Sequence, residues 1–78
     1  MERFFFDLWD SNAFVPDPNG IALPDLAAAR EEALKSARAI LDQGRANGED
    51  RSGWVFEIKN SSYETVLKMP FTEALKSQ

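Results

Sequence analysis

The longest uninterrupted stretch of the chain that favours a single type of secondary structure, a helix, covers residues 26–43. It holds no Gly or Pro, a single β-branched residue and six alanines, so its helix propensity is high throughout. Asp25 is a suitable N-cap, because its carboxylate can accept the first free backbone N–H groups, and Pro24 prevents the helix from extending upstream. The sequence therefore predicts one helix, which ends at Gly44 or Gly48.

One face of this helix is apolar. Small and aliphatic residues recur along it at helical spacing, at Leu26, Ala29, Ala33, Ala37 and Ile40, while charged residues fall mainly on the opposite side. Alanines in the middle of the stripe let a helix axis approach a sheet closely and leave room for bulky strand side chains. The rest of the chain is therefore expected to supply a sheet with an aromatic face.

Three stretches alternate as half-buried strands do, at residues 3–9, 53–59 and 63–69. The predicted inward side chains are Phe4, Phe6, Leu8, Trp54, Phe56 and Ile58. Residues 21–23 are long enough for one more short strand, residues 10–20 are expected to form a loop, and residues 60–62 a hairpin turn. Thr72 can cap a last helical turn, with Phe71 folded onto the core.

The length of 78 residues suffices for a single domain, residues 1–78, because so short a chain cannot bury a second core. Hydrophobic residues make up 44% and charged residues 28%, which is ordinary globular usage and indicates that the chain folds. We expect a two-layer α+β domain in the order β(β)αββ. One long helix packs on an antiparallel sheet of three or four strands, followed by a short C-terminal helical turn.

Short motifs accompany these elements: Arg3-Phe4-Phe5-Phe6-Asp7-Leu8, Leu23-Pro24-Asp25-Leu26 and Met69-Pro70-Phe71-Thr72-Glu73-Ala74. In these motifs the chain resembles a family of small, mostly alphaproteobacterial proteins that is catalogued as a domain of unknown function. Its members share an F-F-D-L start, an L-P-D-L helix entry and an L-P-F-x-E-A ending. The resemblance covers nearly the whole chain and implies a shared fold, but it implies no activity. Members commonly have His where this chain has Trp9, so a role of that His would not apply here.

The composition removes most catalytic chemistry. The chain has no Cys and no His, which excludes disulfides, thiol nucleophiles, imidazole bases and nearly all zinc sites, and it has no G-x-S-x-G motif. Asp7 and Glu57 could pair across adjacent strands. A catalytic carboxylate pair needs a buried pocket that makes the two pKa values differ, but both residues occupy outward-facing strand positions. Asp10, Asp17 and Asp25 lack the spacing of a calcium loop and suit turn and cap roles. We expect no enzyme activity, no metal and no cofactor.

The net charge of −4 is concentrated in residues 1–25, which hold five acids and one base. An acidic chain is poorly suited to bind nucleic-acid phosphates, so direct nucleic-acid binding is not expected. No apolar run approaches the roughly 18 residues of a membrane span, and the charged start at Glu2 and Arg3 is unlike a signal peptide. We expect a cytoplasmic protein that does not bind membranes.

Four apolar residues occupy the alternate strand positions that also hold the charged side chains, and so are expected on the same face: Phe5, Trp9, Val55 and Val66. On the outer face of the sheet they would form a patch with the composition of a binding hot spot. In the alternative arrangement, Trp9 folds under the loop of residues 10–20 and covers Phe5. The sequence alone leaves both arrangements open.

These features favour a non-enzymatic protein-interaction module that binds a protein partner or a second copy of itself through the outer sheet face or a sheet edge. The alternative is an acidic inhibitor or decoy, of the kind that bacterial viruses use against host defence. In that case Asp7, Asp10 and Asp17 would meet the basic nucleic-acid-binding surface of a partner.

Overall fold

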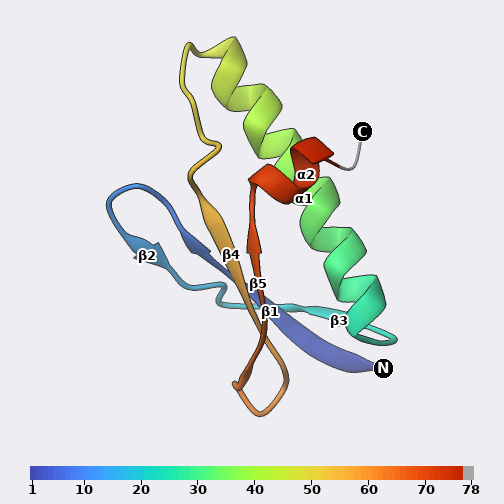
Figure 1. Cartoon of the computed structure of the whole chain (residues 1–78). Helices are drawn as coiled ribbons and strands as arrows, with labels where there is room; N and C mark the ends of the chain where they lie inside the picture. Colours follow the sequence, from blue (N-terminus) through green and yellow to red (C-terminus); the bar gives the residue numbers. More distant parts are fainter. Residues whose placement is uncertain (77–78) are drawn as a thin grey trace.

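The computed structural model describes residues 1–76. In chain order its elements are β1 (Glu2–Trp9), β2 (Phe14–Val15), β3 (Ile21–Leu23), α1 (Leu26–Ala46), β4 (Val55–Lys59), β5 (Thr65–Pro70) and α2 (Thr72–Lys76). The strands form one antiparallel sheet in the order β2-β1-β4-β5, and β3 also pairs with β1 (Figure 1). The α+β class is as predicted. The sheet has five strands and not the predicted three or four. The additional strand, β2, lies within residues 10–20, which were expected to form a loop.

Helix α1 begins where the sequence predicts and ends before Gly48, the second of the two predicted glycines. Asp25 Oδ1 accepts the backbone N–H of Ala28 at 2.8 Å, which confirms the cap. Gly44 lies inside the helix, and the Arg51 side chain packs so close to it that its Cδ would lie 2.8 Å from a Cβ at this position. Gly48 has a φ of +76° and follows the C-cap, as is common after helices.

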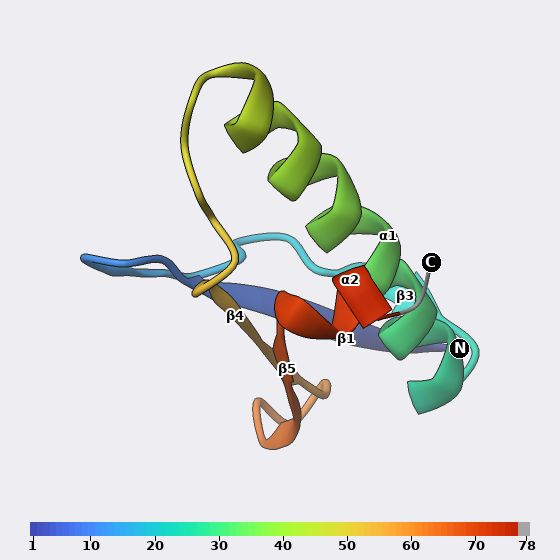
Figure 2. The ribbon, with the colours of Figure 1, turned by 45° about the horizontal axis from the view of Figure 1, so that its top comes forward.

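Both helices cover the same face of the sheet, which we call the inner face (Figure 2). The alanines of the α1 stripe are fully buried, as predicted, and the bulkiest core side chains come from the strands and from Phe71. Phe56 illustrates this packing: it is 5% exposed, and its ring centroid lies 5.0 Å from that of Phe71. Close approach of a small-residue stripe therefore makes room for aromatic side chains of the sheet.

The β4–β5 hairpin contains a bulge. Ile58 pairs with Leu67 and Lys59 with Thr65, so Val66 is an extra residue between the two pairs. Val66 packs against the core cluster. The prediction that Val66 lies on the outer face is therefore wrong, because strict alternation does not continue through a bulge.

Neither helix in residues 1–76 has the length and apolar character needed to cross a membrane.

Candidate functional site

The face of the sheet opposite the helices, here called the outer face, carries a row of apolar side chains across four strands. Cross-strand pairing aligns Trp9 with Phe14 on one side and Val55 on the other, and Val55 with Pro70. Directly opposed residues point to the same side of a sheet, so these four side chains form one band, which we call the apolar row. The rings of Trp9 and Phe14 lie 4.7 Å apart, and Trp9 is still 46% exposed.

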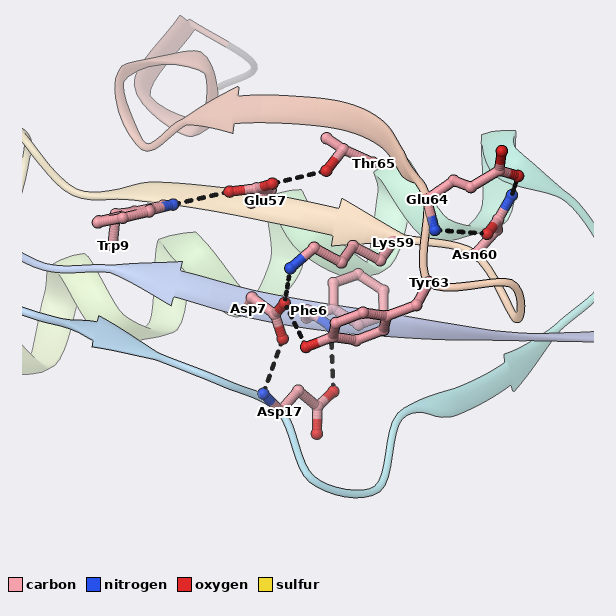
Figure 3. Close-up of polar contacts among 10 residues, drawn as sticks. All are labelled: Phe6, Asp7, Trp9, Asp17, Glu57, Lys59, Asn60, Tyr63, Glu64 and Thr65. Carbon is pink, nitrogen blue, oxygen red and sulfur yellow. Dashed lines mark hydrogen bonds and ion pairs between the residues drawn. The ribbon is translucent and has the colours of Figure 1, made fainter.

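Polar contacts fix the orientation of Trp9 (Figure 3). Its indole N–H donates to Glu57 Oε1 at 2.8 Å, and the Thr65 hydroxyl donates to Glu57 Oε2 at 2.6 Å. The Thr65 hydroxyl first, and then the Trp9 indole, hold the pKa of Glu57 below its usual value. Trp9 is therefore an exposed aromatic side chain with a fixed orientation, and its indole N–H already has a hydrogen-bond acceptor.

Beside the apolar row, Asp7 is the centre of a polar group that we call the Asp7 cluster: Asp7, Asp17, Lys59 and Tyr63 (Figure 3). Lys59 Nζ lies 2.7 Å and the Tyr63 hydroxyl 3.3 Å from Asp7 Oδ2, while the backbone N–H of Asp17 donates to Oδ1 at 2.8 Å. Asp7 lies on the outer face, as its parity predicted, but it is 0% exposed. A buried carboxylate needs such partners, and here every one comes from another segment of the chain.

The Lys59 ammonium lies between aromatic rings as well as against Asp7. It sits 4.3 Å from the ring centroid of Tyr63 and 5.0 Å from that of Phe14. The hydrogen bond to Asp7 is the main reason that the pKa of Lys59 is raised. At neutral pH the amine is therefore protonated, which suits a structural cation and not a nucleophile.

Tyr63 covers this cluster from the hairpin turn. Its φ of 61° lies in the left-handed region, which is strained for a bulky residue. This conformation brings its ring edge-on to Phe5, with centroids 5.7 Å apart, and its hydroxyl to Asp7. Phe5 is half-buried as a result.

In the gap between β2 and β3, the Asp17 side chain replaces a strand as the hydrogen-bond partner of β1. Its Oδ2 accepts the backbone N–H of Phe6 at 3.1 Å, and its Oδ1 accepts those of Asn19 and Gly20 at 3.2 and 3.1 Å. One carboxylate thereby satisfies an N–H of β1 and closes the turn that leads into β3. Asp10 has a similar local role, since its Oδ1 accepts the N–H groups of Asn12 and Ala13.

The predicted patch is thus partly assembled. Trp9 and Val55 lie side by side in the apolar row, Phe5 lies under Tyr63, and Val66 packs against the core. In the alternative arrangement Trp9 was to cover Phe5. Trp9 does contact the loop through Phe14, but Tyr63 is the residue that covers Phe5. Sequence reasoning missed Phe14, Lys59, Tyr63 and Pro70, and only the Phe14-Val15 pair gave a local signal, as a short apolar run within the loop.

The structure separates the contacts of the two carboxylates that could pair across adjacent strands. Asp7 and Glu57 are paired across β1 and β4, but their oxygens bind separate sets of donors. Across residues 1–76, no group of three or more His, Cys, Asp or Glu side chains is placed to hold a metal ion.

A family model described as a domain of unknown function (DUF6894) matches residues 3–72. Searches of curated proteins and of solved structures gave no significant match. The matched range runs from β1 to the start of α2, so it includes both the apolar row and the Asp7 cluster.

Proposed function

The chain belongs to this family of domains of unknown function, and we propose that it is a non-enzymatic protein-interaction module that binds through the apolar row. The observation that carries the proposal is the row itself. It spans four strands, and among residues 1–76 both helices lie on the opposite face. A contiguous apolar band with an exposed Trp has the composition of a binding hot spot.

The outer face suits this role better than a sheet edge. The edge strand β5 has a bulge at Val66, a lysine at position 68 and Pro70 at its end, all of which hinder the addition of another strand. On the other side, the edge of β1 is occupied by β2, by β3 and, between them, by the Asp17 carboxylate. Binding by strand addition is therefore the less favourable mode.

The contacts of the N-terminal acids also favour this proposal over an acidic decoy. Asp7 is buried against Lys59. Asp10, Asp17 and Asp25 accept hydrogen bonds from backbone N–H groups two or three residues further along the chain. A decoy needs carboxylates that are free to meet a basic surface. Carboxylates held in local turns and caps are poorly placed for that.

The rest of the proposal follows from the sequence. We propose a bacterial, cytoplasmic protein, with the alphaproteobacterial source that its motifs suggest. It needs no cofactor, and its acidity makes direct nucleic-acid binding unfavourable.

The proposal is tested by capture with matched variants. Trp9→Ser removes the exposed aromatic residue of the row, and Val15→Ser is the control, because Val15 is 47% exposed but lies outside the row. Wild type and Val15→Ser should retain the same bound protein, whereas Trp9→Ser should lose it. The captured protein, once identified, should shift the NMR signals of Trp9 and Val55 in a titration. Capture that is unchanged in Trp9→Ser would show that the row is not the binding surface.

A further inference from the structure

The chain contains two Asn-Gly pairs, Asn19-Gly20 and Asn47-Gly48. Asparagine is a chemically labile residue, and a following glycine increases its lability, since glycine has no side chain to hinder attack by its own backbone nitrogen. We infer that Asn47 is a site of spontaneous deamidation in the folded protein, whereas the fold protects Asn19. This inference is independent of the proposed function, because neither pair belongs to the apolar row.

The reaction at Asn47 needs water as its one co-reactant. The backbone nitrogen of Gly48 bonds to Cγ of Asn47, the bond between Cγ and Nδ2 breaks, and ammonia leaves with the proton of the glycine N–H. Water then opens the succinimide ring at either carbonyl, which gives aspartate or isoaspartate. The glycine N–H must give up its hydrogen bond for the ring to form, and the peptide group between the two residues must move with it. The contacts of that peptide group therefore determine the rate.

Charged side chains hold the peptide group between Asn19 and Gly20 from both ends. The N–H of Gly20 donates to Asp17 Oδ1 at 3.1 Å, and the Asn19 carbonyl accepts from the Arg3 guanidinium at 2.7 Å. The Gly20 carbonyl accepts from the same guanidinium at 3.3 Å. Gly20 also lies so close to β1 that a Cβ there would be 2.8 Å from the Phe4 carbonyl oxygen. Reaction at this pair therefore breaks charge-assisted hydrogen bonds, which are about twice as strong as neutral ones.

Neutral backbone contacts hold the peptide group between Asn47 and Gly48, which follows the last turn of α1. The N–H of Gly48 donates to the Arg45 carbonyl at 3.0 Å, and that of Glu49 donates to the Gly44 carbonyl at 2.7 Å. Within residues 1–76, the carbonyl and the side-chain amide of Asn47 have no hydrogen-bond partner. A Cβ on Gly48 would meet no atom within 4 Å, so the peptide group has room to move. Because helix ends fray at little cost in free energy, this pair should reach the reactive geometry more often than the other.

The product changes the end of the helix. Asn47 is the C-cap of α1, and either product places a carboxylate where the helix dipole disfavours negative charge. Isoaspartate also adds a methylene group to the backbone at the cap. Deamidation should therefore loosen the last turn of α1 and leave the outer face of the sheet unchanged.

The experiment incubates the folded protein at mildly alkaline pH and follows both asparagines by peptide mapping. Trypsin separates the two pairs, because Asn19 falls in the peptide of residues 4–30 and Asn47 in that of residues 46–51. Asn47 should convert about tenfold or more faster than Asn19, as expected if reaction at Asn19 must first break a charge-assisted hydrogen bond. In urea, where neither pair is held, the two rates should be similar.

Two variants test the cause of the difference. Arg3→Gln removes the guanidinium from the Asn19 peptide group, so it should speed conversion of Asn19 and leave that of Asn47 unchanged. Asn47→Gln changes an exposed side chain and should abolish the faster reaction.

Equal rates at the two asparagines of the folded protein would overturn the inference, as would faster conversion of Asn19. An Asn47 that reacts in urea but not in the folded protein would show that the fold protects both pairs, and would overturn it too. An Arg3→Gln variant in which Asn19 reacts no faster would show that the guanidinium does not protect this pair, against the reason given for the difference.

Discussion

The two faces of this one sheet are buried by different means. On the inner face, Phe56 and Ile58 are 5% and 0% exposed beneath two regular helices. On the outer face, Asp7 is also 0% exposed, but a loop, a turn and a lysine side chain cover it. Apolar contact with a helix is tolerant of small shifts, whereas hydrogen bonds and ion pairs depend on distance and angle. Because the buried apolar side chains lie in the core under the helices, we expect the inner face to supply most of the stability.

The largest expected effect contrasts two phenylalanines, one on each face. Phe56→Ala should lower the free energy of unfolding by about 3–5 kcal/mol, because it removes a buried ring that packs on Phe71 and leaves a cavity. Phe5→Ala should cost less, about 1–2 kcal/mol, since Phe5 is half-buried and its ring partner Tyr63 is exposed. Urea unfolding of both variants measures the difference. Equal losses would mean that the outer face is a second core of similar weight.

Two aspartates provide the next contrast. Asp17→Ala should destabilise by about 1–3 kcal/mol, because it leaves the N–H groups of Phe6, Asn19 and Gly20 without their acceptor. Asp25→Ala removes one cap contact from α1 and should cost about 0.5–2 kcal/mol. Thermal unfolding of the two variants, with Asp10→Ala alongside as a turn control, gives the order. If Asp25→Ala is the more damaging, the loop contributes little to the stability of β1.

The inner layer could be predicted from the sequence because its signals are local and periodic. The Asp25 cap, the alanine stripe and the alternation around Phe56 each reside within one element, and each was confirmed. An error arose where an extra residue interrupts the alternation of a strand. Val66 packs against the core because of a bulge in the β4–β5 hairpin. This bulge is not visible in the residues next to Val66.

The outer face could be predicted only in part, because its contacts are distant in sequence. Parity placed Asp7, Trp9 and Val55 on the correct side. It could not reveal that Lys59 and Tyr63, more than fifty residues away, would bury Asp7. Such a cluster depends on the sheet register and on a residue with positive φ, and only the folded chain determines these.

The smallest expected effect concerns alkaline pH and the outer face alone. The pKa of Lys59 is raised in the folded protein, mainly by its hydrogen bond to Asp7. The stabilisation from this ion pair is therefore complete below the pKa of an unfolded lysine, about 10.4, and is lost as the pH rises through the higher folded value. Urea unfolding from about pH 9 upward should show wild type losing stability that Lys59→Met does not lose. A parallel decline in the two proteins would mean that the contact between Lys59 and Asp7 does not stabilise the fold, and that apolar contacts hold the outer face as they hold the inner one.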